Sequence, residues 1–218
     1  QNYEVIIADD LSNSEESVLE GINSVCGIKP EWSNIDLSDN HKAVKFLKNQ
    51  NFDGIIHFAA FKAVGESVKN PLKYYRNNLL SLMNVMSYLK IHNHCAFIFS
   101  SSCTVYGQAK SLPITENMEI KRAESPYGNT KQICEEILKE SSTAHNLKSI
   151  SLRYFNPIGA HPTGKIGELP LGIPQNLVPF ITQSAAGIRG ALSVYGDDYP
   201  TPDGTAIRDY IHVVDLAQ

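Results

Sequence analysis

A tyrosine and a lysine four residues apart are the side chains of this sequence best suited to chemistry. Tyr127 and Lys131 share one helix face if the segment from Pro126 onward is helical, because residues i and i+4 lie one turn apart. A free tyrosine has a pKa of about 10 and is a poor base at neutral pH. A lysine cation beside it favours the phenolate and lowers that pKa. The pair therefore indicates proton transfer to or from an alcohol.

Three consecutive serines lie upstream of this pair, where the apolar run 97–99 ends. The last of them, Ser102, is placed at a strand end to hydrogen-bond both a substrate hydroxyl and the Tyr127 phenol. The same tyrosine–lysine spacing also arises by chance in helices without a catalytic role, so the pair alone does not define a site. The serines, and the proline before the tyrosine, favour the catalytic interpretation. The catalytic interpretation then depends on whether the chain also has binding sites for a dinucleotide and a substrate.

Strand-like apolar runs alternate with helix-like segments over the first 156 residues. The predicted strands are 5–8, 32–35, 54–60, 96–101 and 150–155, and the predicted helices are 14–22, a short one around 43–47, 71–93 and 127–146. A helix between successive strands requires a parallel sheet with right-handed crossovers. The sequence thus predicts an α/β fold of the Rossmann type, a doubly wound parallel sheet.

Ligands of such sheets bind beyond the carboxyl ends of the strands. The residues predicted at those ends are Asp9, Asp36, Phe58, Ala59, Ser102 and Asn156. An acid at the tip of the first strand, here Asp9, is the group that a dinucleotide fold uses to hold the adenosine ribose hydroxyls. By itself Asp9 is interpreted equally well as a helix cap or a loop acid. The convergence of these positions supports a ligand site more strongly than any one residue.

The composition changes beyond residue 156. The stretch 159–176 is rich in glycine and proline, which predicts a long ordered loop or lid. We expect a helix over 176–187 and strands over 193–196 and 205–214. The expected domains are therefore a dinucleotide-binding domain of residues 1–156 and, from residue 157 to 218, the start of a smaller substrate-binding lobe.

The bulk composition excludes several classes of protein. The 218 residues are 42% hydrophobic and 19% charged, as in ordinary globular proteins. The net charge of −4 gives no sign of the basic surface that binds nucleic acid. No apolar run reaches the length of a membrane span, about 18 residues. Four cysteines without Cys-x-x-Cys spacing favour a reducing compartment, so we expect a cytoplasmic protein. We expect no metal site, because His92 and His94 form only a weak candidate.

The sequence resembles the extended short-chain dehydrogenase/reductase family, and within it the branch of UDP-sugar 4-epimerases. The segments that carry the resemblance are 9–13, 57–67, 74–78, 99–107, 125–131, 153–168, 172–180 and 203–217. In that family a first strand and a Gly-rich turn for the pyrophosphate precede the position of Val5, and the nucleotide-sugar lobe continues past that of Gln218. The resemblance therefore implies an interior portion, without the first βα unit, that is inactive alone.

The resemblance also implies ligands and their binding residues. The cofactor would be NAD, held by Asp9, Asn13, Asp36, Phe58, Ala59, Lys62, Asn77, Tyr127, Lys131 and Phe155. The substrate would be a UDP-hexose, held by Ser102, Tyr127, Asn156, Asn176, Ser193, Tyr195 and Arg208. The catalytic set would be Ser102, Tyr127 and Lys131, interconverting UDP-glucose and UDP-galactose through a 4-keto sugar. Without the resemblance, an ion pair with Asp209 is the simpler interpretation of Arg208. Helices 71–93 and 127–146 would form a homodimer contact.

Other functions match part of the pattern. A UDP-N-acetylhexosamine 4-epimerase shares these motifs, and a nucleotide-sugar decarboxylase would need a positive group for a substrate carboxylate. A dehydratase of the same family would need an acid after the serines, whereas Cys103 and Thr104 follow Ser102. A non-catalytic dinucleotide-binding protein usually loses the tyrosine or the lysine, and this chain has both.

Overall fold

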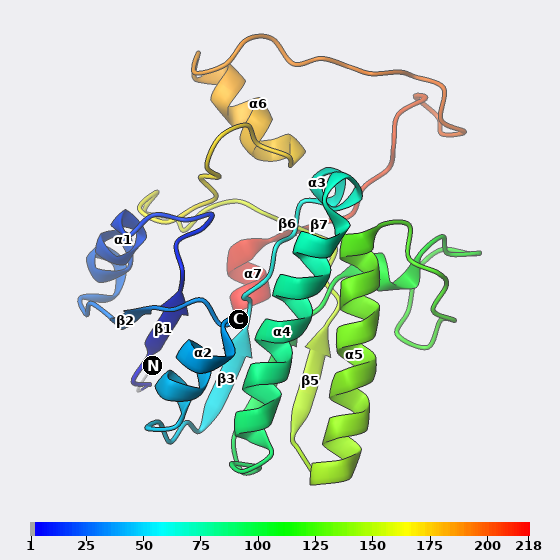
Figure 1. Ribbon diagram of the computed structural model, residues 1–218. Coiled ribbons are helices and arrows are strands. Elements are labelled where there is room, and N and C mark those ends of the chain that lie inside the picture. Colours follow the sequence, from blue (N-terminus) through cyan, green and yellow to red (C-terminus); the bar gives the residue numbers. More distant parts are fainter. Residues whose placement is uncertain (1–2) are drawn as a thin grey trace. The chain divides into compact units, whose positions relative to one another are not determined.

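The computed structural model describes residues 3–218 (Figure 1). Their internal contacts divide them into two compact units. The first, called here the tyrosine unit, consists of residues 6–10 and 32–154; the second, called the loop unit, consists of 3–5, 11–31 and 155–218. These bounds differ from the expected division at residue 156, because residues 11–31 group with the later part of the chain. The division into cofactor and substrate domains stays a prediction.

Three parallel strands form the main sheet of the tyrosine unit. They are β3 (Gly54–His57), β4 (Ala96–Ser100) and β5 (Ser149–Leu152), in the order β3-β4-β5. Ile98 pairs in register with Ile56 on one side and with Ile150 on the other. Side chains alternate along a strand, so Phe97 and Phe99 point to the opposite face, where each is 1% exposed.

Three helices cover the face that Phe97 and Phe99 occupy. They are α2 (Asn40–Leu47), α4 (Pro71–Leu89) and α5 (Pro126–His145), and α4 and α5 run side by side along the sheet (Figure 1). Both long helices begin with a proline, whose missing N–H is not needed in the first turn. The core that they close contains Leu47, Leu82, Val85, Met86, Tyr88, Leu89, Cys95, Phe97, Phe99, Cys134 and Leu138.

The other strands form two further sheets. β1 (Ile6–Asp9) pairs with β2 (Glu31–Asn34), and β6 (Asn156–Ile158) pairs in parallel with β7 (Tyr210–His212). The sequence predicted one continuous sheet, and the described residues instead form three. The difference arises because a sheet continues only where neighbouring strands exchange backbone hydrogen bonds, and β1 and β3 are not such neighbours.

Shorter helices complete the two units. The tyrosine unit adds α3 (Val64–Lys69) and the 3₁₀ helix η1 (Cys103–Tyr106), and the loop unit contains α1 (Ser17–Cys26), α6 (Leu177–Ala185) and α7 (Val213–Ala217). In residues 3–218, no helix is long and apolar enough to cross a membrane.

Two strand predictions for the loop unit were wrong. Residues 193–196 form no strand, and only Tyr210–His212 of the expected stretch 205–214 is a strand. A strand needs a partner for its backbone N–H and C=O groups, and within the described part of the chain none lies along 193–196. The prediction that Asn156 ends a strand was also wrong: β5 stops at Leu152, and Asn156 begins β6.

Candidate functional site

The structure brings Ser102, Tyr127 and Lys131 together in the tyrosine unit. Hydrogen bonding by Ser102 acts to lower the pKa of the Tyr127 phenol, and the Lys131 Nζ lies 5.9 Å from the centroid of the Tyr127 ring. All three residues are buried, with exposed fractions of 8%, 9% and 4% in sequence order. The spacing of Tyr127 and Lys131 on one helix face is therefore as predicted, and the strand-end serine completes the group.

Local sequence explains the position of each of these side chains. Ser102 lies two residues beyond β4 and caps η1, because its Oγ accepts a hydrogen bond of 3.2 Å from the Thr104 N–H. Ser125 caps α5 in the same way, accepting from the Gly128 N–H at 3.1 Å. This cap places Tyr127 in the first turn of the helix and Lys131 in the next.

The predicted lowering of the Tyr127 pKa by Lys131 is not found. Burial raises the pKa of Tyr127 to about 12, and the hydrogen bond with Ser102 opposes that rise only in part. The Lys131 ammonium is directed elsewhere: it donates a hydrogen bond of 2.7 Å to the Ser100 carbonyl oxygen. Burial also lowers the pKa of Lys131 to about 8, while Cys134 and Glu135 act in the opposite direction. In this arrangement the phenol is neutral at pH 7.

A partly buried ion pair beside the serines was not predicted from the sequence. Arg153, just after β5, donates from Nη2 to Glu135 Oε2 at 2.6 Å and from Nε to Glu135 Oε1 at 3.0 Å. The Ser101 hydroxyl donates to the same carboxylate. Glu135 follows Lys131 by four residues, the spacing that also relates Lys131 to Tyr127, so this signal was available in the sequence.

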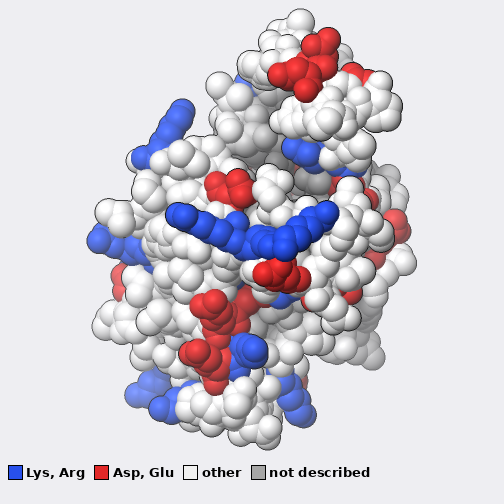
Figure 2. All heavy atoms as spheres, turned by 90° about the vertical axis from the view of Figure 1, so that its right-hand side faces the viewer, with Lys and Arg blue, Asp and Glu red and all other residues white. Residues whose placement is uncertain are grey.

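Most other charged side chains lie at the surface. On the face that Figure 2 shows, basic and acidic side chains are interspersed, without a broad field of one sign. Pairs such as Lys110–Glu119, at 3.7 Å, are largely exposed, and ion pairs of this kind contribute little stability. The partly buried Glu135–Arg153 pair is different because water screens it less.

Sequence reasoning also missed His57, the last residue of β3. Its ring is stacked on Phe99, with centroids 6.1 Å apart and planes at 21°, and it is 4% exposed. Burial, and then the charge of Lys131, lower the pKa of His57 to about 3. The imidazole is therefore neutral at physiological pH, and it adds an uncharged aromatic wall beside Lys131.

The cofactor positions predicted in the tyrosine unit lie at or just beyond strand ends, or on α4. Asp9 ends β1, while Phe58, 63% exposed, directly follows β3. Ala59 comes next, and its carbonyl oxygen accepts from the Ser81 hydroxyl at 3.3 Å. The exposed Lys62 precedes α3.

Two further positions make local contacts. Asp36 Oδ1 accepts hydrogen bonds from the N–H and the hydroxyl of Ser38, so this carboxylate closes a turn after β2. Asn77, on α4, donates to the neighbouring Asn78 side chain at 3.1 Å. The remaining cofactor positions, Asn13 and Phe155, belong to the loop unit.

The substrate positions predicted after residue 155 belong to the loop unit. Pairing of β6 with β7 brings Asn156 beside the chain around Arg208, and the Asn156 amide donates to the Asp209 carbonyl oxygen at 2.7 Å. The amide of Asn176 instead donates to Glu168 Oε1 at 2.8 Å. Ser193 and Tyr195 lie on an irregular stretch, and Tyr195 is 99% exposed.

The alternative interpretation of Arg208 as the partner of Asp209 is not observed in the described residues. Its Nη1 donates to the Ile207 carbonyl oxygen at 2.9 Å, and its side chain is exposed. The guanidinium therefore keeps donors for another acceptor, and a fork of donors suits phosphate oxygens.

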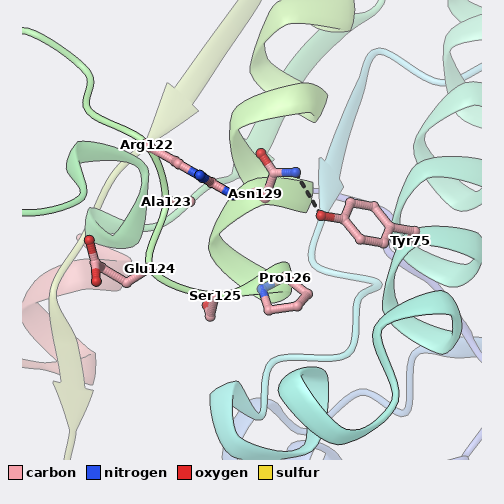
Figure 3. Close-up of a pocket in the computed structure, with 7 residues that line it drawn as sticks. All are labelled: Tyr75, Arg122, Ala123, Glu124, Ser125, Pro126 and Asn129. Atoms are coloured by element: carbon pink, nitrogen blue, oxygen red, sulfur yellow. Dashed lines mark hydrogen bonds between the residues drawn. The ribbon is translucent and has the colours of Figure 1, made fainter.

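A shallow pocket of about 230 Å³ lies at the start of α5 (Figure 3). Its lining residues are Tyr75, Arg122, Ala123, Glu124, Ser125, Pro126 and Asn129. The Asn129 amide donates to the Tyr75 hydroxyl at 2.6 Å and so joins α5 to α4. This pocket does not include the Ser102–Tyr127–Lys131 group. Across residues 3–218, no cluster of His, Cys, Asp and Glu is suited to hold a metal ion, and the four cysteines are free.

Comparison with known proteins identifies the relatives of this chain. A UDP-glucose 4-epimerase of Yersinia enterocolitica is 47% identical over 219 residues, covering 100% of this chain and 65% of that protein. One of Bacillus subtilis is 46% identical over 217 residues, covering 99% of this chain and 64% of that protein. The chain thus spans less than two thirds of the length of these relatives.

Solved structures show the same fold. The UDP-glucose 4-epimerase of Bifidobacterium longum in complex with NAD⁺ and UDP has a TM-score of 0.95 at 46% identity, covering 99% of this chain and 65% of that one. This likeness confirms the predicted Rossmann-type α/β class. The family model described as "NAD dependent epimerase/dehydratase family" matches residues 1–218. The chain belongs to the NAD dependent epimerase/dehydratase family.

Proposed function

We propose that the protein carrying this chain is an NAD-dependent enzyme that interconverts UDP-glucose and UDP-galactose. The observation that supports this most directly is the buried group of Ser102, Tyr127 and Lys131, which is suited to proton transfer with an alcohol. Relatives 46–47% identical over the whole chain bear the name UDP-glucose 4-epimerase. Because the chain spans about 65% of their length, the proposal concerns the whole protein rather than this stretch alone.

The residues present are suited to NAD. Asp9 ends β1 with a carboxylate, the group that accepts hydrogen bonds from ribose hydroxyls. Residues 8–14 contain two acids and no lysine or arginine. The negative charge of this segment would repel the additional phosphate of NADP, which favours NAD. When bound, NAD supplies the redox chemistry: it accepts hydride from the sugar C4 and later returns it.

The proton chemistry is assigned to the chain itself. Tyr127 takes the proton of the sugar 4-hydroxyl, and Ser102 donates a hydrogen bond to the oxygen as charge develops on it. Lys131 is assigned the role of stabilising the phenolate once it forms, because its Nζ, 5.9 Å from the centroid of the ring, carries the nearby positive charge. The pKa of Tyr127 is about 12, so the phenol needs further positive charge close to it before it can act as the base at pH 7.

We assign binding of the UDP moiety to Asn156, Asn176, Ser193, Tyr195 and Arg208, with Arg208 on the diphosphate. We further propose a homodimer formed through α4 and α5, in a cytoplasmic protein. Exposed apolar side chains on α4 support such a contact, since Leu72 is 76% exposed and Met83 is 45% exposed.

The deciding experiment incubates the full-length protein with UDP-galactose and NAD, without a reductant, and measures UDP-glucose. Tyr127→Phe should lower turnover by roughly 10²–10⁴-fold while the circular dichroism spectrum stays unchanged, because proton transfer is lost. The control Tyr3→Phe removes the hydroxyl of a tyrosine that is 79% exposed, and it should turn over normally. Unchanged turnover in Tyr127→Phe would contradict the proposal.

A second candidate substrate is a UDP-N-acetylhexosamine. The structure of the UDP-Glc/GlcNAc 4-epimerase of Campylobacter jejuni has a TM-score of 0.80 at 34% identity and covers 100% of this chain. Comparing kcat/KM for UDP-galactose and UDP-N-acetylgalactosamine distinguishes the two substrates. We expect the UDP-hexose to be preferred, because the relatives of higher identity are named for UDP-glucose.

A further inference from the structure

The serine segment, defined here as Ser100–Tyr106, is tied to the neighbouring elements at several points. The Ser101 hydroxyl donates to Glu135 on α5, and the Cys103 N–H donates to the Tyr154 carbonyl oxygen at 3.1 Å. The Ser100 and Tyr154 hydroxyls are also hydrogen-bonded. Ser102 therefore lies between two residues, Ser101 and Cys103, whose positions are set by contacts outside the segment.

Glu135 is the residue on which these contacts converge. Its carboxylate accepts from Ser101 and receives three hydrogen bonds from Arg153, at 2.6, 3.0 and 3.2 Å. The Arg153 guanidinium also lies 5.0 Å from the centroid of the Tyr106 ring, at the far end of the serine segment. Glu135 and Arg153 together thus hold the segment on both sides of Ser102.

Glu135 also affects Lys131 directly. The two residues are one helical turn apart on α5, and the Glu135 charge raises the pKa of Lys131 against the effect of burial. The other titratable groups acting on or beside Lys131 are Tyr127 and Cys134 on α5 and His57 on β3. Burial leaves each of them uncharged at pH 7, with pKa values of about 12, 12 and 3. Among these groups, Glu135 alone supplies a negative charge.

Stability is a poor explanation for such a pair. The side chains of Glu135 and Arg153 are 12% and 20% exposed, and taking two charges out of water offsets much of their attraction. A partly buried pair joined by three hydrogen bonds instead favours one geometry.

We propose that Glu135 is a positioning residue, which holds the Ser102 hydroxyl and the Lys131 ammonium in place for proton transfer through its contacts with Ser101 and Arg153. This inference rests on the proposed function, in which Ser102, Tyr127 and Lys131 move the proton. It assigns a role to Glu135, the first acidic residue of α5.

The test uses three variants of the full-length protein with NAD. Glu135→Gln keeps the shape and removes the charge, and Glu135→Asp keeps the charge. The control Glu119→Gln removes an exposed ion pair. For each variant, kcat and KM for UDP-galactose are measured against pH, and hydrogen exchange of residues 100–106 is followed by mass spectrometry.

Glu135→Gln should lower kcat by roughly ten- to hundredfold with little change in KM, since misplaced catalytic groups slow the reaction at that scale. The loss of activity at high pH should begin at a lower pH than in the wild type, because Lys131 loses its proton more readily without the opposite charge. Exchange in residues 100–106 should rise. Glu135→Asp should recover the wild-type pH dependence, and Glu119→Gln should match the wild type in all three measurements.

A purely structural ion pair gives a different result. Glu135→Gln would then unfold at a lower temperature but keep the wild-type kcat, pH profile and exchange, and the proposal would be overturned. If Glu135→Gln does not fold, Ser101→Ala replaces it: lower kcat and faster exchange support the proposal, and wild-type values overturn it. A wild type unable to epimerise UDP-galactose contradicts the proposed function instead, and the exchange data still decide whether Glu135 positions the serines.

Discussion

The ammonium of Lys131 donates a hydrogen bond of 2.7 Å to the carbonyl oxygen of Ser100, which joins helix α5 to the end of strand β4. The lysine is 4% exposed, and its Nζ lies 4.9 Å from the centroid of the Phe99 ring. Burial disfavours the charged form and lowers the pKa of Lys131 from 10.5 to about 8. The site therefore holds a cation at the expense of folding stability.

Replacing this lysine should stabilise the fold while abolishing turnover. Below pH 8 the lysine is charged in both the folded and the unfolded chain, so burying the charge lowers the free energy of unfolding by its full amount. Between pH 8 and 10.5 only the unfolded chain stays charged, and this destabilisation disappears as the pH rises. Lys131→Met should raise the free energy of unfolding at pH 7 by about 1–3 kcal/mol, less whatever the lost bond to Ser100 contributed. Urea unfolding at pH 7 and pH 10 measures this, and a variant less stable at pH 7 would disprove it.

The neutral His57 should make the fold sensitive to acid. Its pKa falls from 6.5 to about 3 on folding, so between these values the unfolded chain binds a proton that the folded chain does not, and stability is lost as pH falls. The His57→Leu variant cannot bind that proton. Between pH 8 and pH 4 its free energy of unfolding should therefore fall by about 3 kcal/mol less than that of the wild type. Urea unfolding at the two pH values gives both losses. Equal losses in the two proteins would show that His57 is not responsible.

Asn78 should be important for the segment that follows β3. The residue is 2% exposed, its Oδ1 accepts from the Phe61 N–H at 2.9 Å, and its Nδ2 donates to the Phe61 carbonyl oxygen and to Thr130 Oγ1, each at 3.1 Å. Asn78→Ala removes all three hydrogen bonds and leaves the Phe61 N–H and carbonyl oxygen without these partners, which should cost about 2–4 kcal/mol of unfolding free energy. Hydrogen exchange should rise in residues 58–63. The control Asn51→Ala, at an exposed position, should change neither quantity.

Two glycines with positive φ differ in the space that an added Cβ would have. Gly107 has φ +60°, and a Cβ there would lie 2.5 Å from the Arg122 carbonyl oxygen, whereas Gly27 has φ +71° and nothing within 4 Å of such a Cβ. Gly27→Ala should therefore cost about 1 kcal/mol, the strain of the left-handed backbone alone. Gly107→Ala should cost about 1–3 kcal/mol more, because its ψ of −141° lies outside the left-handed α region and the loop around Arg122 must move. Thermal unfolding of both variants checks the difference, which equal costs would contradict.

The long helices could be predicted because their signals are local. The prolines at Pro71 and Pro126, the Ser125 cap and the apolar spacing all lie within the segments themselves, so the expected helices 71–93 and 127–146 differ from α4 and α5 by at most a few residues. Strand predictions were less secure, since a strand exists only with a partner. Residues 193–196 have strand-like side chains and no neighbour along them in the described chain.

The sequence by itself determined the spacing of Tyr127, Lys131 and Glu135 along one helix face and the serines that end β4, because helix periodicity and strand length are properties of short segments. Only the tertiary structure decided what these groups do to one another. Lys131 meets Ser100 across 31 residues, and Arg153 meets Glu135 across 18. Burial then sets the pKa values of Tyr127 and Lys131, and burial depends on every element packed around the site.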